Sequence, residues 1–404
     1  MTDTQTKRRA LHIERISALV HGSNQLAFCA MGSFTAIYLG FLGFTDSEIG
    51  FTSSLVSLFA VAIQLLLADF SDKHSSLPLK YIVTGMYAAG IVLAAAVNFL
   101  PLPIAAMMLV YALAHAFSNA MDCFISAMIM QFANAGIPVR YGWPRSVGSV
   151  TFALLALGLG WVIEEQSPAI LMPLYMILAV IAMTVVCFMP SAPKSPEAAA
   201  NRQSRENKIS YPQMLKRNPT LLLFILAMCV CSLGNSPSYT FLIRIVERLG
   251  GNASTLGLAL FLQACMELPS LCLSSFFVRK FRRRTLLTMV MALRLVRILG
   301  IMLAPNLTVF FLVTCVGGFN NGISMFASVE FINSIVSDGE RVRSQSLLSF
   351  TNTFGSVVGT ALAGVILDSL GLGIMLGSGC AIVACGMGLM LVCARLHRKG
   401  FGNV

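Results

Sequence analysis

The sequence predicts an all-α membrane protein with twelve transmembrane helices in two six-helix bundles. Of its 404 residues, 56% are hydrophobic and only 11% are charged, whereas about a quarter of the residues in a soluble domain carry charge. The apolar residues form continuous runs of roughly 20, the length with which a helix crosses a hydrocarbon core of about 30 Å. Because these runs do not alternate with polar residues, they favour helices over a barrel.

Twelve such runs follow one another along the chain, separated by shorter polar segments. The first is too long for the apolar core of a secretory signal peptide and is not followed by a convincing cleavage site, so it is expected to remain as a helix. The expected spans are 17–44, 49–68, 81–99, 104–133, 143–163, 169–189, 219–246, 255–278, 285–304, 307–336, 347–367 and 372–394.

The basic residues indicate the orientation of these helices. Almost all Lys and Arg residues outside the spans fall on one side of a twelve-helix arrangement, and Arg248 falls on the other. Since cytoplasmic loops are enriched in Lys and Arg, both termini are expected in the cytoplasm. This asymmetry explains the net charge of +11 without a nucleic-acid partner. The eleven cysteines are scattered within the spans without disulfide or metal-ligand spacing, which fits the inner (plasma) membrane of a bacterium.

One long polar segment, residues 191–218, is rich in proline, alanine and basic residues. It is predicted to be a cytoplasmic linker between an N-terminal bundle, residues 1–190, and a C-terminal bundle, residues 219–404. The two halves carry parallel landmarks, because a charged loop follows the second helix at 68–74 and the eighth helix at 278–284. Repeats of this kind are typical of transporters that bind their solute between the repeats, near the bilayer midplane.

Several motifs occur in a characteristic order. The segment 38–50 reads YLGFLGFTDSEIG, the segment 141–149 reads YGWPRSVGS, and 327–332 reads ASVEFI; the segment 249–269 adds LGG and ELP. Over about residues 30–370 this order resembles the major facilitator superfamily, in the branch of lactose permease, nucleoside:proton symporters and phenylpropionate permeases. In the segment 64–73, Asp72 and Lys73 occupy the acidic and basic places of that branch's conformational loop, and Ala68 replaces a glycine. The resemblance implies a monomeric transporter that works by alternating access without a cofactor.

Seven charged side chains fall inside the expected spans. Each needs a partner, a water-filled cavity or a function, because a charge in the bilayer interior is costly. Arg244, near the outer end of its helix, is expected to extend to the interface. Glu330, near a cytoplasmic helix end, is expected either in an interfacial ion pair or in proton coupling. The seven residues are Asp122, Arg145, Arg244, Glu267, Arg294, Arg297 and Glu330.

Three polar residues of the fourth span share one helix face, because His115, Asn119 and Asp122 follow i, i+4, i+7 spacing. In the resembling branch, an acidic residue here pairs with a fifth-helix arginine in the sugar site of lactose permease, and Asp122 and Arg145 match those places. A carboxylate and a guanidinium can grip hydroxyl groups or separate and pair again during transport. The alternative is a structural salt bridge near the cytoplasmic interface.

Glu267 is the leading candidate for proton coupling, with Asp122 and Glu330 as the others. A carboxyl group buried in a low-dielectric cavity can exchange a proton near neutral pH. Arg294 and Arg297 roughly share a face of the ninth span and call for acidic charge partners, for which Glu267 and Glu330 are available, so a static pairing of Glu267 is the alternative. Lactose permease carries its proton on a histidine and a glutamate whose places correspond here to Gly317 and Asn320, and neither residue titrates.

Neutral hydrogen-bonding residues complete the candidate site: Asn24, Asn235, Tyr239, Asn320 and Asn352. They suit a polyol or a nucleoside, although such a residue taken singly is more often a helix–helix contact. The sequence thus predicts proton-coupled uptake of a small neutral or weakly polar solute, sugar-like or nucleoside-like. The open alternatives are efflux of amphipathic aromatic compounds and a membrane sensor that does not transport. An enzyme is not expected, because no catalytic motif or metal-ligand set occurs.

Overall fold

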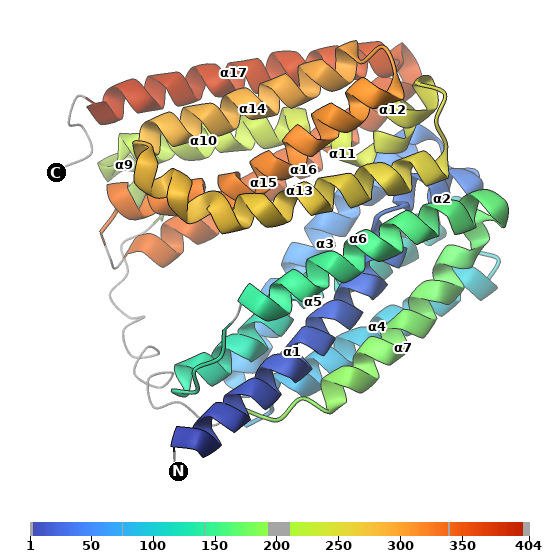
Figure 1. The fold of residues 1–404 in the computed structure, drawn as a ribbon. Coiled ribbons are helices and arrows are strands. Elements are labelled where there is room, and N and C mark those ends of the chain that lie inside the picture. Colours follow the sequence, from blue (N-terminus) through green and yellow to red (C-terminus); the bar gives the residue numbers. More distant parts are fainter. Residues whose placement is uncertain (1–2, 75, 141, 193–210, 338–339, 399–404) are drawn as a thin grey trace. The chain divides into compact units, whose positions relative to one another are not determined.

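The computed structural model describes residues 3–74, 76–140, 142–192, 211–337 and 340–398 (Figure 1). Within these ranges the chain forms helices and no strands, and twelve of the helical segments are long. Ten are long and apolar enough to cross a membrane. The other two, α1 (Asp3–Gly32) and α13 (Ala253–Lys280), have 30 and 28 residues and carry more polar side chains. The all-α, twelve-helix membrane fold expected from the sequence is confirmed.

The chain divides into two compact units, which are described separately. Unit 1 comprises residues 1–42 and 55–208, and unit 2 comprises residues 43–54 and 209–404. The helix α3 (Asp46–Lys73) therefore contributes its first turns to unit 2 and the rest to unit 1. Most of the expected linker, residues 193–210, lies outside the described residues, and its last part forms a short helix, α9 (Tyr211–Arg217).

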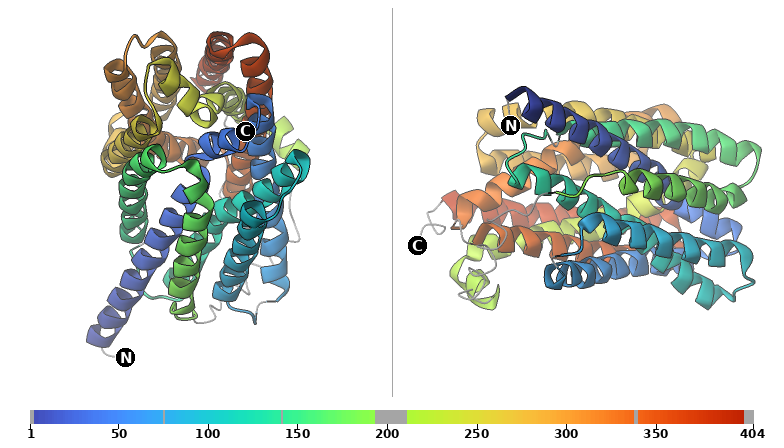
Figure 2. Two further views of the ribbon diagram at one scale, coloured as in Figure 1. Left: turned by 90° about the vertical axis from the view of Figure 1, so that its right-hand side faces the viewer. Right: turned by 90° about the horizontal axis from the view of Figure 1, so that it is seen from below.

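Unit 1 is a helical bundle in which α1 packs against α6 and α7, while α4 packs against α5 and α7 (Figure 2). Its largest buried side chains are aromatic, among them Tyr87, Tyr111, Tyr175 and Phe132. These side chains fill the space between helices, which leaves little room for polar groups. The remaining elements of this unit are α2 (Thr35–Phe41), α4 (Leu79–Phe99), α5 (Ile104–Asn134), α6 (Gly142–Glu165), η1 (Pro168–Ile170) and α7 (Leu171–Cys187).

Unit 2 is held by close packing of helix backbones. A Cβ atom on Gly355 or Gly359 of α16 would collide with the carbonyl oxygen of Cys229 or Leu233 of α10. These two glycines therefore permit the close approach of the two helices. The elements are α10 (Pro219–Asn235), α11 (Pro237–Thr240), α12 (Leu242–Arg248), α14 (Arg283–Leu303), α15 (Leu307–Ile335), α16 (Arg341–Leu370) and α17 (Leu372–Arg398).

Two of the expected spans are interrupted. The span 17–44 breaks between α1 and α2, where Thr35 Oγ1 donates a hydrogen bond to the Gly32 carbonyl at 2.9 Å. The span 219–246 breaks between α10 and α11 at Pro237, which has no N–H to continue the helix. There Ser238 Oγ donates to the Asn235 carbonyl at 2.7 Å. Side-chain hydroxyl groups thus satisfy carbonyl groups at both breaks, as helix interruptions within a membrane require.

The segment 68–74 differs from the expected loop. The helix α3 continues through Asp72 to Lys73, so these two residues lie in its last turn. No glycine or proline interrupts the segment, and Lys73 Nζ pairs with Asp69 Oδ2 at 2.6 Å, four residues earlier, a spacing that supports a helix. Ala68, which stands where the resembling branch has glycine, also favours helix continuation.

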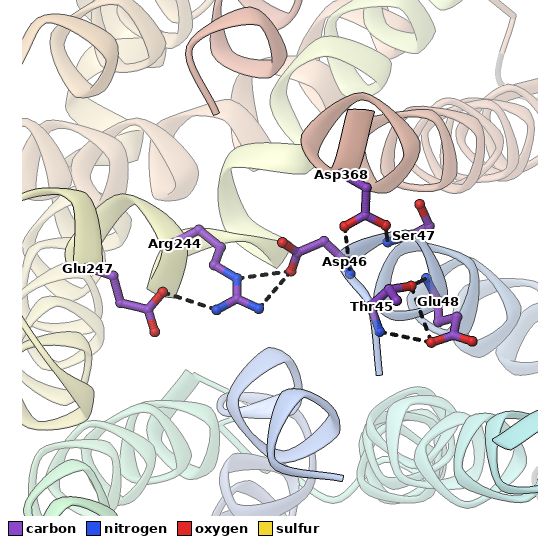
Figure 3. A network of polar contacts seen from close by, with 7 residues as sticks. All are labelled: Thr45, Asp46, Ser47, Glu48, Arg244, Glu247 and Asp368. Carbon is purple, nitrogen blue, oxygen red and sulfur yellow. Dashed lines mark hydrogen bonds and ion pairs between the residues drawn. The ribbon is translucent and has the colours of Figure 1, made fainter. Parts of the chain in front are cut away.

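The first turn of α3 is joined to α12 and α16 by a charged network within unit 2 (Figure 3). The Asp368 carboxylate accepts hydrogen bonds from the backbone N–H groups of Asp46 at 3.1 Å and Ser47 at 2.6 Å. A carboxylate at this place satisfies amide groups that a helix N-terminus leaves unpaired. Arg244 donates to Asp46 Oδ1 at 2.9 Å and to Glu247 Oε2 at 3.1 Å. Carboxylates from two elements, α3 and α12, therefore hold the Arg244 guanidinium.

Candidate functional site

The candidate site in unit 1 centres on the Asp122 carboxylate of α5. Its Oδ2 lies 3.6 Å from an Arg145 guanidinium nitrogen of α6. Its Oδ1 lies 3.8 Å from His21 Nδ1 and accepts a hydrogen bond from Gln25 Nε2 at 3.3 Å, both from α1. Three helices thus bring a carboxylate, a guanidinium, an imidazole and an amide together. The two charged side chains are 37% and 38% exposed, so the pair is accessible rather than sealed in the core.

The other polar residues of α5 do not all join this cluster. Asn119 is exposed on the same side of the helix, whereas His115 is buried and packs against Tyr111 and Phe28. A Cβ atom on Gly32 would lie 2.8 Å from His115 Nε2, so His115 fills the space beside the break in the first helix. Along the expected polar face of α5, the Asn119 and Asp122 side chains are therefore at least partly exposed, whereas the His115 side chain is buried.

Asn24 of α1 has a different environment from its neighbour Gln25. It is 2% exposed, and its Oδ1 accepts a hydrogen bond from the Tyr87 hydroxyl of α4 at 2.7 Å. This arrangement is the helix–helix contact that the sequence left open as an alternative. His21 and Gln25 both reach Asp122 because they lie four positions apart on one face of α1.

A second polar cluster lies in unit 2 around Arg297 of α14, which is only 1% exposed. One guanidinium nitrogen donates to Ser238 Oγ at 2.7 Å and to Asn235 Oδ1 at 3.3 Å. The guanidinium carbon lies 3.8 Å from the centroid of the Tyr239 ring, within the range of a cation–π contact. The Tyr239 hydroxyl donates to Asn321 Oδ1 at 3.3 Å. Asn235, Ser238 and Tyr239 therefore lie beside the break between α10 and α11, whereas Asn321 lies on α15.

The acidic partners expected for the arginines of α14 are arranged differently. Glu330 accepts hydrogen bonds from Arg283 at 2.9 and 3.2 Å near the start of α14. This contact is the ion pair expected as one of the two alternatives for Glu330. Glu330 is therefore not available as a partner of Arg294 or Arg297. Arg294 donates to the neutral Ser324 Oγ at 2.9 Å. Within the described residues, no carboxylate forms an ion pair with Arg294 or Arg297.

The remaining candidates of unit 2 lie at helix contacts. Glu267 of α13 is partly buried, and its backbone carbonyl accepts from Ser270 Oγ at 2.7 Å beside Gly322 of α15. Asn320 is 2% exposed. Asn352 of α16 accepts a hydrogen bond through its backbone carbonyl from Ser232 at 2.7 Å. The side-chain oxygens of both asparagines are buried and have no hydrogen-bond partner among the described residues.

One buried charge of unit 1 was not anticipated. Glu14, which precedes the first expected span, is 4% exposed and accepts hydrogen bonds from the backbone and side chain of Arg140 at 2.8 and 3.3 Å. Burial alone raises the pKa of the Glu14 carboxyl, but the hydrogen bonds and charge of Arg140 outweigh it, so the pKa falls below its ordinary value. This pair ties α1 to the segment before α6, which carries Arg145.

Comparison with known proteins identifies the fold and the family. A model of the family described as "MFS_1 like family" matches residues 26–375, most of the chain. The chain therefore belongs to the MFS_1-like family. It is a multi-pass membrane transporter of the major facilitator superfamily and not an enzyme. The resemblance to this superfamily that the sequence motifs indicate is confirmed.

Individual relatives of this MFS_1-like transporter are distant. A "Maltose permease" of Geobacillus stearothermophilus is 26% identical over 267 residues, which cover 64% of each chain, so the match spans less than two thirds of that permease. Two crystal structures share the fold. A mutant of the nucleoside transporter NupG has a TM-score of 0.76 at 15% identity, covering 95% of this chain and 99% of that one. A bacterial homologue of the iron transporter ferroportin, in an inward-facing state, has a TM-score of 0.72 at 14% identity with the same coverage.

Proposed function

We propose that this MFS_1-like transporter carries out proton-coupled uptake of a small neutral or weakly polar solute, sugar-like or nucleoside-like, by alternating access. The observation that carries the proposal is the convergence of His21, Asp122 and Arg145 from three helices at one accessible point of unit 1. A maltose permease and a nucleoside transporter among its relatives support a polyhydroxylated solute.

The Asp122 cluster has the groups that such a cycle requires. The carboxylate accepts hydrogen bonds from solute hydroxyl groups, and the Arg145 guanidinium donates to solute oxygens. A proton that binds Asp122 removes its attraction for Arg145 and frees the guanidinium for the solute. Protonation of Asp122 thereby favours binding of the solute, which couples the movement of the proton and the solute in the same direction. We place this coupling at Glu267 or Asp122, because Glu330 is held by Arg283.

The proposal includes the membrane context. The asymmetry of basic residues supports an inner-membrane protein with both termini in the cytoplasm. We also propose that the protein is a monomer of two bundles, residues 1–190 and 219–404. In this orientation the membrane potential, negative inside, drives a solute into the cell together with a proton.

The test is uptake by purified protein in liposomes. The solutes are labelled maltose, labelled uridine and a labelled aromatic amine, each with and without an inward proton gradient. Accumulation of the sugar or the nucleoside that is abolished by a protonophore is the expected result. Accumulation of the amine alone, driven by a proton gradient of the opposite direction, would indicate efflux of aromatic compounds and not uptake. Binding of a ligand without movement of any of the three solutes would indicate a membrane sensor that does not transport.

A further inference from the structure

Two arginines of α14 place positive charge inside unit 2. Arg294 and Arg297 are one helical turn apart, and the first is partly exposed while the second is buried. Their hydrogen-bond partners are the hydroxyl groups of Ser324 and Ser238 and the amide oxygen of Asn235. All three are neutral. Buried cations of membrane-spanning segments almost always have a carboxylate or another anion beside them, so this pair departs from the usual pattern.

The acid that would neutralise the pair is not supplied by the described residues. Glu330 is engaged by Arg283 at the other end of α14, and within the described ranges the hydrogen-bond acceptors of Arg294 and Arg297 are neutral. In addition, the Nε and one terminal nitrogen of Arg297 have no hydrogen-bond partner in the part of the chain that the structure describes. Arg297 therefore has unused donors as well as an unbalanced charge.

The opposite helix leaves room for this arginine. A Cβ atom on Gly317 of α15 would lie 2.6 Å from both Cδ and Nε of Arg297, so any larger residue would displace the guanidinium. The acidic residue of α15, Glu330, is held by Arg283.

We propose that Arg294 and Arg297 bind a carboxylate group of the transported solute. A guanidinium matches a carboxylate in charge and in planar geometry, and its two parallel N–H groups can donate to both oxygens. Partly exposed Arg294 makes the first contact, and Arg297, oriented by Tyr239 and Ser238, provides the second. This inference rests on the proposed transport function and extends its range from neutral or weakly polar solutes to solutes that carry a carboxylate group. Movement of a proton with the anion cancels its charge, which removes the opposition of an inside-negative potential.

The test compares ligands that differ only in the acidic group. Thermal unfolding of the purified full-length protein is measured with glucuronate against glucose and with benzoate against benzyl alcohol, at equal ionic strength adjusted with sodium chloride. At least one acid is expected to raise the unfolding temperature more than its neutral analogue, because a ligand that binds the folded state stabilises it. Equal shifts within both pairs would overturn the proposal. An equal shift with chloride alone would assign the site to a free inorganic anion and would also overturn it.

Variants locate the effect. Arg294→Gln and Arg297→Gln are expected to weaken the acid-dependent stabilisation at least about tenfold in apparent Kd, and Arg297→Lys by less, because lysine keeps the charge without the planar fork. Arg283→Gln is the matched control, since Arg283 lies on the same helix but already has Glu330 as partner. If Arg297→Gln fails to fold, Arg294→Gln and Arg297→Lys carry the comparison. Undiminished stabilisation in these variants would place the carboxylate elsewhere and refute the assignment.

The binding test is independent of transport. Acid-dependent stabilisation without movement of any solute into liposomes would reject the proposed function and keep the anion site. Accumulation of a neutral sugar or nucleoside, without stabilisation by either acid, would keep the function and reject the anion site.

Discussion

Replacing Asp122 with asparagine is expected to lower solute uptake by roughly 10- to 100-fold while leaving the protein folded. The amide keeps the size of the side chain but loses the charge that Arg145 and His21 face at 3.6 and 3.8 Å. Charge-assisted hydrogen bonds contribute about 1.5 to 3 kcal/mol. If this energy lowers the barrier to solute transport, its loss slows uptake by roughly 10- to 100-fold. The pair is more than a third exposed, so its contribution to folding is about 0 to 1 kcal/mol.

The measurement is initial uptake by cells that contain equal amounts of each variant, judged by immunodetection in the membrane fraction. Asp122→Glu keeps the charge and is expected to retain part of the activity. Glu165→Gln, an exposed carboxylate at the end of α6 in the same unit, serves as the neutral control. Wild-type rates in Asp122→Asn would show that the carboxylate is only a structural partner of Arg145.

Gly359→Val is expected to destabilise unit 2 by about 3 kcal/mol or more. Gly359 of α16 lies against the Leu233 carbonyl of α10, where an added Cβ atom would also lie 2.8 Å from the carbonyl carbon. The obstacle is backbone, so relief requires the two helices to separate along their whole contact. Overpacking of a rigid core costs about 1 to 3 kcal/mol, and occasionally more.

Thermal unfolding in detergent reports this effect. Gly388→Val in α17 is the matched control, because Gly388 is exposed and a Cβ atom there would meet nothing within 4 Å. The first variant is expected to unfold at a clearly lower temperature than wild type and the second at an unchanged one. Equal unfolding temperatures for both variants would mean that α10 and α16 do not meet at these glycines.

The number of long helices could be predicted from the sequence because length and hydropathy determine it, but the interruptions could not be located equally well. Pro237 is a visible signal for the break after α10. The break after Gly32 has no proline, and it depends on His115 of α5 filling the space beside that glycine. Such an interruption arises from packing between distant segments, which a single-helix pattern does not contain.

The candidate site shows the same division. The family resemblance and the common face of α5 together indicated that Asp122 faces Arg145, and the two side chains do approach each other. That His21 and Gln25 join them depends on the rotation of α1. The expectation of carboxylate partners for Arg294 and Arg297 followed from counting charges. It missed that the break at Pro237 provides neutral acceptors and that Glu330 reaches Arg283.

Movement of protons together with the solute tests the proposed mechanism most directly. A pH-sensitive dye inside liposomes that contain the purified transporter records the internal pH when a transported solute is added outside, without an imposed gradient. For wild type, internal acidification that begins with solute addition is expected, and Asp122→Asn is expected to show none. Solute entry at an unchanged internal pH would contradict proton coupling.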